Sequence, residues 1–234
     1  METDGGFSRW QTPLGSFWVP AASKGDVMYD LGEQERDIYG TANSRVHPGD
    51  IVFDCGANVG VFTRKALNAG ASKVVAIEPA PENLACLRRN FAAEIAAGSV
   101  VVVPKGVWDS ETELIMHVDT DHSAADSFVR PLSGATVQDL RLPVTTIDNL
   151  VRELGLSSVN FIKMDIEGSE RRAIVGAKRT ISSFRPRMAI CVYHLADDPV
   201  VIPQAVDAAG AGYRTERSCL LDKDMVEPQV MHFY

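Results

Sequence analysis

Four polar side chains stand at the ends of predicted buried strands, where they could bind a ligand or move a proton. Each one closes an apolar run: Asp54 after 51–53, Glu78 at the end of 73–78, Asp165 after 159–164 and His194 just after 188–192. Because the carboxyl ends of parallel strands meet at one rim of an α/β sheet, we expect these groups to lie together. Since a neutral imidazole titrates near working pH, His194 is a candidate general base; a structural histidine and a metal ligand are the alternatives.

A turn of small residues follows Asp54 directly. Gly56, Ala57 and Gly60 carry little side-chain bulk, and apolar residues at helical spacing come next. A strand, a tight turn and a helix N-terminus let the backbone approach a ligand closely, although an ordinary strand–turn–helix corner would look the same. Roughly twenty positions further along stands Glu78, where nucleotide-binding α/β units place a carboxylate for the ribose hydroxyls.

A second motif is rich in carboxylates and spans a predicted strand–helix corner. It reads Lys163-Met164-Asp165-Ile166-Glu167-Gly168-Ser169-Glu170. Two or three carboxylates at one rim can bind a hard cation, a cationic cofactor group or substrate hydroxyls. Glu170 lies in the first helical turn, where a capping interaction is an equally good explanation.

The two motifs together resemble those of the FkbM family of class I S-adenosylmethionine-dependent methyltransferases. The resemblance covers roughly residues 46–192 and rests on Asp-Cys-Gly-Ala-Asn-Val-Gly at 54–60 and Lys-x-Asp-x-Glu-Gly-x-Glu at 163–170. It implies S-adenosylmethionine as the cofactor, with Val107 and Trp108 as candidates for the adenine wall. The full set of implied cofactor-binding residues is Asp54, Gly56, Ala57, Asn58, Gly60, Glu78, Val107, Trp108 and Asp165.

The reaction that the resemblance implies is O-methylation of a small molecule, such as a secondary metabolite or a sugar-like compound. A hydroxyl needs a base or a metal when it attacks a methyl group, so His194 and Asp165 are the predicted catalytic residues. Asp165, Glu167 and His194 are the candidate ligands of a magnesium or calcium ion. N- or C-methylation, and a non-catalytic binding protein that retains the fold, are the alternatives. A nicotinamide oxidoreductase would need G-x-G-x-x-G, from which residues 56–60 depart.

Composition bounds the class of protein and its partners. The 234 residues carry a formal net charge of −8, which disfavours nucleic acid or an anionic membrane as the main partner. Four cysteines without zinc-type spacing indicate reduced thiols, and no apolar run reaches membrane-spanning length. We therefore expect a cytoplasmic protein with a small-molecule acceptor, for which a homodimer is compatible with the sequence.

Alternating strand and helix patterns predict one doubly wound, mostly parallel, Rossmann-like sheet of the class I methyltransferase type, with an antiparallel strand pair at its C-terminal edge. Residues 1–45 form a lead-in, which starts as a short hairpin or an irregular segment and continues into a helix over 32–46, and which would cover substrate and cofactor. Residues 46–234 form the methyltransferase domain, with a loop insertion at about 119–139. The other expected helices cover 82–97, 146–154, 169–184 and 199–209, and the other expected strands cover 100–103, 113–118, 141–144, 213–219 and 229–233.

Overall fold

A seven-stranded sheet forms the centre of the computed structural model, which describes all residues except 1, 23–24, 120–125, 132–135, 211 and 223–224. Five neighbouring strands pair in parallel. At one edge the next strand runs antiparallel to both of its neighbours, so the outermost strand runs in the same direction as the five. The strands in spatial order are β12 (Thr215–Asp222), β13 (Met225–Phe233), β11 (Arg187–Cys191), β10 (Phe161–Met164), β4 (Ile51–Cys55), β5 (Lys73–Ile77) and β6 (Val100–Val103). The predicted fold class and its C-terminal antiparallel pair are confirmed.

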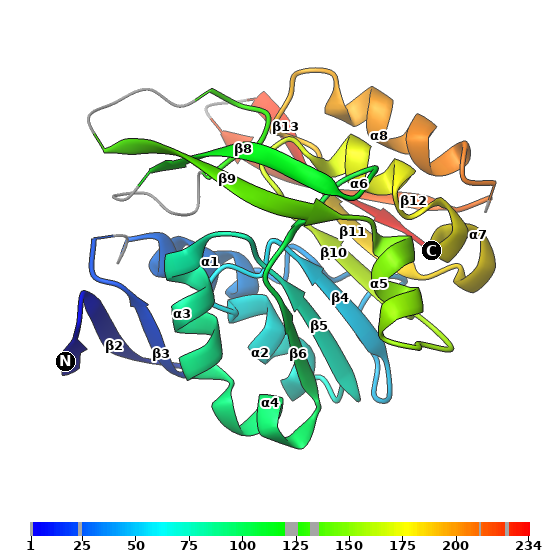
Figure 1. Cartoon of the computed structure of the whole chain (residues 1–234). Coiled ribbons are helices and arrows are strands. Elements are labelled where there is room, and N and C mark those ends of the chain that lie inside the picture. Colours follow the sequence, from blue (N-terminus) through cyan, green and yellow to red (C-terminus); the bar gives the residue numbers. More distant parts are fainter. Residues whose placement is uncertain (1, 23–24, 120–125, 132–135, 211, 223–224) are drawn as a thin grey trace.

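Helices cover both faces of this sheet (Figure 1). One face carries α1 (Asp26–Glu35), α2 (Val61–Asn68), α3 (Pro81–Asn90) and α4 (Ala92–Ala97), and the other carries α5 (Ile147–Glu153), α6 (Glu170–Val175), α7 (Lys178–Phe184) and α8 (Asp198–Asp207). Successive side chains of a strand point to opposite faces. Val52 therefore packs with Phe62 of α2, while Phe53 packs with Ile174 of α6. Burial on both faces explains why the strands are continuous apolar runs.

Two helices that the sequence predicts as continuous are broken by tertiary packing. The helix expected over 82–97 ends at Phe91, whose non-helical φ of −123° lets its ring pack against Gly60. The helix expected over 169–184 divides at Gly176, where an added Cβ would lie 2.1 Å from the carbonyl oxygen of Trp108. Helical periodicity continues across both breaks because each half still faces the same sheet.

The helix expected over 32–46 is wrong in its position. The chain is helical earlier, over α1, and the helix ends at Arg36. Asp37 then adopts a left-handed φ of 54°, and its carboxylate pairs with the Lys65 ammonium at 2.5 Å. The remaining residues before β4 form turns that bury Tyr39. A left-handed residue stops an α-helix, and only the contact with α2 explains why it occurs here.

Two small sheets flank the central one. The predicted N-terminal hairpin is confirmed and forms β1 (Glu2–Asp4), β2 (Phe7–Thr12) and β3 (Gly15–Pro20). The side chain of Asn90 on α3 holds it, bonding both the amide (2.6 Å) and the carbonyl (3.0 Å) of Trp18. The second sheet contains β7 (Gly106–Val107), β8 (Thr112–Asp119) and β9 (Val137–Thr145), so the two strands expected around the insertion are present and longer than predicted. Residues 120–125 and 132–135 of that insertion lie outside the described residues.

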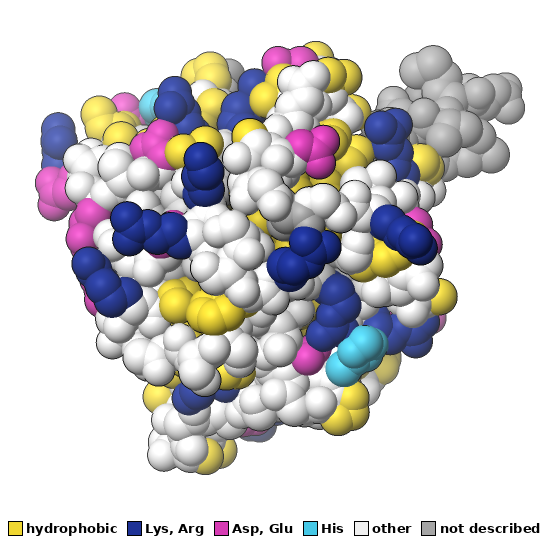
Figure 2. Space-filling view, turned by 90° about the vertical axis from the view of Figure 1, so that its right-hand side faces the viewer, with side chains coloured by type: hydrophobic (Ala, Val, Ile, Leu, Met, Phe, Trp, Pro, Cys, Tyr) yellow, Lys and Arg dark blue, Asp and Glu magenta, His cyan; other side chains and the backbone are white. Residues whose placement is uncertain are grey.

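The surface offers few further constraints on partners. Within the described part of the chain, no helix combines the length and the apolar character that crossing a membrane requires. Figure 2 shows one face, on which Lys and Arg side chains are spread out and the hydrophobic side chains occur in small groups.

Candidate active site

A cavity of about 990 Å³, including its solvent-open mouth, lies at the carboxyl ends of β4, β5 and β10. This is the rim at which ligands bind in open α/β sheets. The walls include six of the predicted cofactor-binding residues, which are Gly56, Ala57, Asn58, Glu78, Val107 and Asp165. Of the four residues that the strand-end argument selected, Glu78 and Asp165 line the cavity, whereas Asp54 and His194 do not.

The small-residue turn is shaped by close backbone contacts. The amides of Gly56 and Ala57 both donate to the carbonyl oxygen of Ile77, each at 3.0 Å. Gly56 has a φ of 78°, and an added Cβ would lie 1.9 Å from the backbone oxygen of Asp165. Only glycine fits where the turn passes under the end of β10. The turn is thus fixed between β5 and β10 and leaves its open side to the cavity.

Glu78 lies at the end of β5 and is buried. Its two carboxylate oxygens accept hydrogen bonds from the backbone amides of Asn58 (2.9 Å) and Ala80 (2.8 Å). Burial raises the pKa of Glu78 to about 7, although these hydrogen bonds act in the opposite direction. The side chain is held rigidly at the cavity wall and keeps lone pairs for hydroxyl donors.

Asp54 and Gly60 lie beneath the turn and do not line the cavity. The fully buried Asp54 carboxylate accepts from the Thr63 hydroxyl at 2.6 Å and lies 3.4 Å from the Lys163 ammonium. Burial raises the pKa of Asp54, and Lys163 partly offsets this. Asp54 therefore supports the turn from below in this structure, and its predicted cofactor contact stays a prediction. Gly60 instead packs on the ring of Phe91, where an added Cβ would approach to 2.2 Å.

Lys163 supports the same turn from the neighbouring strand. Its ammonium donates to the carbonyl oxygen of Gly56 at 2.7 Å and lies over the ring of Tyr39. Burial alone would lower the pKa of Lys163, but Asp54 and Asp165 raise it above its usual value. A buried cation is thus fixed at the cavity wall.

The two residues predicted for the adenine wall lie differently. Val107 lines the cavity, whereas Trp108, which directly follows β7, does not. The amide of Trp108 donates to the carbonyl oxygen of Thr145, and its ring lies 5.7 Å from the guanidinium of Arg172 on α6. Side chains alternate along a strand, so one of two adjacent residues must point away from the cavity.

Asp165 connects the cavity to a buried charge cluster. Its Oδ2 accepts a 2.6 Å hydrogen bond from the Tyr39 hydroxyl, and its Oδ1 lies 3.4 Å from Nε2 of His194. Oδ1 has no conventional hydrogen-bond partner within the described ranges. Burial would raise the pKa of Asp165, but Lys163 and His194 lower it overall. Asp165 is consequently an ionised carboxylate at the cavity wall, with Oδ2 bonded to Tyr39 and the buried Oδ1 facing His194.

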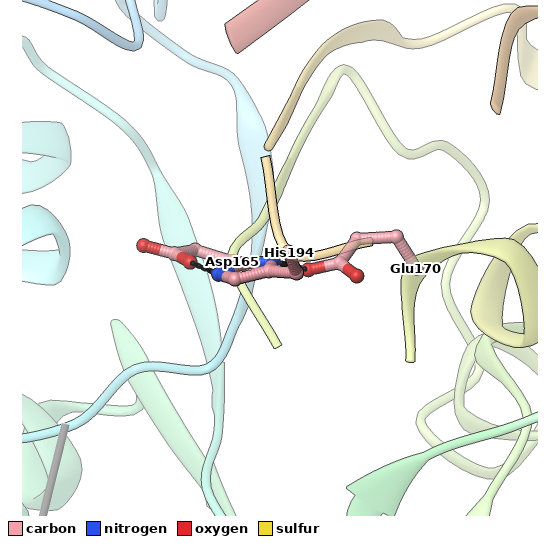
Figure 3. Close-up of side chains that lie close together, drawn as sticks. All are labelled: Asp165, Glu170 and His194. Atoms are coloured by element: carbon pink, nitrogen blue, oxygen red, sulfur yellow. Dashed lines mark hydrogen bonds and ion pairs between the residues drawn. The ribbon is translucent and has the colours of Figure 1, made fainter. Parts of the chain in front are cut away.

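His194 lies between carboxylates on both sides (Figure 3). Its Nδ1 is 2.9 Å from Glu170, and its Nε2 is 3.2 Å from Glu167. Burial by itself would lower the pKa of His194, but these carboxylates and Asp165 raise it to about 11. The ring is therefore protonated at neutral pH. An imidazolium has no free lone pair, so this arrangement disfavours the predicted role of His194 as general base.

The same geometry bears on the metal prediction. Ligand atoms of Asp165, Glu170 and His194 all lie within 4.8 Å of one another, whereas the expected set contained Glu167 in place of Glu170. Glu170 also holds the loop that precedes α6, because its oxygens accept from the amides of Ile166 (2.8 Å) and Gly168 (3.0 Å). A histidine ligand must be deprotonated. The residues fit a buried ion-pair cluster better than a cation site, and the metal prediction gains no support.

Several cavity residues are absent from the sequence prediction. Glu33 and Gln34 on α1, Tyr39, Asn83 on α3, Asp126 and Tyr193 all contribute to its walls. Burial raises the pKa of Glu33 to about 7, with Asp165 adding to the effect. Acidic residues three positions apart, Asp30 and Glu33, lie on one helix face and could have indicated this contribution. No spacing signal marks Asp126.

Similarity to known proteins is consistent with this site. A family model described as the Methyltransferase FkbM domain matches residues 54–214, which include both motifs. The 31-O-demethyl-FK506 methyltransferase FkbM of Streptomyces tacrolimicus is 30% identical, over 57% of this chain and 61% of that protein. The crystal structure of methyltransferase FkbM from Methylobacillus flagellatus KT has a TM-score of 0.59 and 24% identity, over 81% of this chain and 44% of that one.

A more distant solved structure shares the fold over the whole chain. TYW2 of M. jannaschii, in complex with AdoMet, has a TM-score of 0.53 and 13% identity, over 100% of this chain and 87% of that one. The present chain spans about three fifths of the length of the Streptomyces relative and less than half of the Methylobacillus chain.

Proposed function

Because this chain belongs to the FkbM methyltransferase family, we propose that it transfers the methyl group of S-adenosylmethionine to a hydroxyl of a small molecule. Support for the cofactor comes from the family match, from the glycine turn and from the buried Glu78 carboxylate at the cavity wall. Support for a hydroxyl acceptor comes from the O-methyltransferase name of the Streptomyces relative. A secondary metabolite or a sugar-like hydroxyl compound is the expected acceptor class.

The cavity residues fit such a cofactor. The backbone of Gly56 and Ala57 would lie against its methionine part, Glu78 would accept from the ribose hydroxyls, and Val107 would contact the adenine. S-adenosylmethionine supplies an electrophilic methyl carbon, so the protein has to align the acceptor and remove its proton.

Asp165 is the residue that we assign to the proton of the acceptor hydroxyl. It lines the cavity and is ionised, and this single observation favours a hydroxyl nucleophile. Tyr39 and His194 fix its position from two sides. His194 acts through Asp165, as a positioning residue whose positive charge keeps the carboxylate ionised. A positioned base contributes about 10²–10⁴-fold to such a reaction.

Calorimetric titration with S-adenosylhomocysteine, with and without EDTA and added magnesium or calcium, tests the cofactor assignment. We expect saturable binding that does not depend on the metal. A folded protein that does not bind the ligand would contradict the proposal.

Methyl transfer from labelled S-adenosylmethionine to a panel of hydroxyl compounds then tests the role of Asp165. We expect Asp165→Asn to lower kcat by about 10²-fold or more while S-adenosylhomocysteine still binds. Asp109→Asn is the matched control, because Asp109 pairs with Arg172 and does not line the cavity. An unchanged kcat in Asp165→Asn would remove this residue from the mechanism.

A further inference from the structure

Carboxylates outnumber cations on the walls of the cavity. Among the described residues, six side-chain carboxylates but only two lysine ammonium groups line it. Two of the carboxylates, Asp30 and Glu33, belong to α1, and two more, Asp165 and Glu167, directly follow β10. A wall with this excess of negative charge favours a ligand that carries positive charge.

The carboxylates of α1 are the ones that the protein leaves without a cation of their own. Glu167 lies 2.7 Å from the guanidinium of Arg130. Neither Asp30 nor Glu33 forms an ion pair within the part of the chain that the structure describes. Burial raises the pKa of Glu33 to about 7, and burial followed by the charge of Glu33 raises the pKa of Asp30. A cationic ligand group would therefore stabilise both carboxylates in their ionised form.

The next residue of α1 is an independent sign of an unsatisfied site. Gln34 is 7% exposed and lines the same cavity, and its Oε1 has no hydrogen-bond partner within the described ranges. A buried acceptor without a donor is costly. Because this oxygen and the neighbouring carboxylates are all acceptors, the α1 side of the cavity fits a ligand group that donates hydrogen bonds.

These acceptors lie beside the residue that we assign to the acceptor proton. The Tyr39 hydroxyl donates to Asp165 at 2.6 Å and lies 3.4 Å from Oε2 of Glu33. A single hydroxyl group thus separates Glu33 from Asp165. A ligand group bound by Glu33 would consequently be close to the hydroxyl that reacts.

Two exposed tyrosines lie at the same end of the cavity. Tyr29 on α1 is 59% exposed, Tyr193 after β11 is 38% exposed, and both line the cavity. Burial and then Glu33 raise the pKa of Tyr29, and Asp165 and Cys191, the last residue of β11, add to this effect. In the strand order β11-β10-β4, β11 lies on the side of β10 away from the glycine turn. The two tyrosines therefore belong to the side of the cavity that the acceptor would occupy.

We propose that the acceptor carries a cationic amine beside the hydroxyl that is methylated, and that Asp30 and Glu33 bind this amine. The inference rests on the proposed function, because it specifies the acceptor of that reaction. An ammonium group supplies both the positive charge and the N–H donors that complement the α1 side of the cavity. Tyrosine rings favour the same ligand, since cations are attracted to aromatic faces. Amino sugars, amino cyclitols and other amino alcohols form the substrate class that fits.

Matched acceptor pairs test this inference. Each amino alcohol, beginning with glucosamine, is compared with its N-acetyl derivative, which keeps the hydroxyl groups but carries no positive charge. Methyl transfer from labelled S-adenosylmethionine by the full chain gives kcat/KM for both members. We expect kcat/KM to be about tenfold higher or more for the amine, mainly through a lower KM. Equal values, a preference for the acetylated members, or no transfer to any amine-bearing member would overturn the inference.

Glu33→Gln keeps the size of the side chain and removes its charge. The KM for the amine should rise by about tenfold more than the KM for its acetylated partner, so that the preference disappears. Glu35→Gln is the control, because Glu35 is exposed on the same helix and does not line the cavity, and it should retain the preference. Asp30→Asn repeats the test if Glu33→Gln does not fold. A preference that survives in the folded variant would overturn the inference.

S-Adenosylhomocysteine distinguishes an acceptor site from a cofactor site, because it carries the amino group of the cofactor. Its affinity should stay within about twofold in Glu33→Gln, whereas a loss of about tenfold would assign the carboxylate to the cofactor and overturn the inference. A folded wild type that does not bind this ligand would overturn the proposed function, and the inference with it. Transfer to the acetylated acceptors alone would overturn only the inference.

Discussion

The two ends of the cavity use the same residue types for opposite purposes. At the end of the cavity near β5 and β6, the carboxylates of Glu78 and Asp126 have no buried cation as a direct partner among the described residues, and burial raises the pKa of both. At the transfer end, defined by Asp165, His194 and Glu170, two buried cations compensate the carboxylates and lower the pKa of Asp165. A carboxylate thus becomes a ligand acceptor or part of an ion-pair cluster according to whether a cation lies beside it.

The largest effect is expected at the transfer end. His194→Gln would leave Asp165 and Glu170 buried without their shared cation, so the free energy of unfolding should fall by about 3–5 kcal/mol. His117→Gln, at the exposed pair with Asp139, should change it far less. Urea denaturation measures both variants. Equal destabilisation by the two variants would mean that the buried histidine contributes no more to stability than the exposed one.

The pH dependence of this effect has a definite sign. The folded-state pKa of His194, about 11, lies above the unfolded value near 6.5. Its contribution to stability is therefore complete below about pH 6.5 and is lost progressively as the pH rises toward about 11. The difference between wild type and His194→Gln should be larger at about pH 6 than at about pH 9. A difference that grows with pH would contradict a protonated ring.

An intermediate effect is expected at the turn that joins the two ends. Gly56 and Gly98 have nearly the same φ, 78° and 76°, but only Gly56 faces a backbone oxygen. Gly98→Ala should cost about 1–2 kcal/mol, the price of a left-handed alanine. Gly56→Ala adds a collision and should cost more and also abolish S-adenosylhomocysteine binding. Thermal unfolding and calorimetry check this, and equal losses in the two variants would show that the close approach is unimportant.

At the end of the cavity near β5 and β6, the expected effects are on ligand binding. Glu78→Gln removes a charged acceptor and should lower the affinity for S-adenosylhomocysteine by about tenfold. Because the pKa of Glu78 is about 7, wild-type affinity should fall as the pH falls from about 8 to about 6. The variant should show a shallower dependence, to which Asp126 still contributes. Calorimetric titration across this pH range measures the affinities. An identical pH profile in the variant would exclude Glu78 from contact with the ligand.

The smallest effect is expected just outside the cavity. Trp108→Phe should leave S-adenosylhomocysteine affinity within about twofold, because the ring packs toward Arg172 on α6. Val107→Ala, one residue earlier on the cavity wall, is the comparison and should weaken binding measurably. A large loss of affinity in Trp108→Phe alone would restore Trp108 to the adenine wall.

Local signals in the chain were sufficient for the order of the main elements and for one rim of the sheet. Continuous apolar runs predict doubly buried strands, and glycine after a strand predicts a close backbone approach. The broken helices could not be predicted in the same way. Gly176 interrupts a helix because the backbone of Trp108, more than sixty residues earlier, lies against it, and periodicity within the helix contains no information on that contact.

The sequence by itself therefore determined the family motifs, the strand ends and the presence of Glu78 and Asp165 at one rim. Only the tertiary structure decided what each group does there. Asp54 supports the turn because Thr63 and Lys163 enclose it, and His194 is a cation because three carboxylates from the 163–170 motif surround it. Asp126 lines the cavity from the segment between β8 and β9, where no sequence motif marks it. The physical reason is that burial and local charge are sums over segments distant in sequence, whereas periodicity and spacing report only on neighbours along the chain.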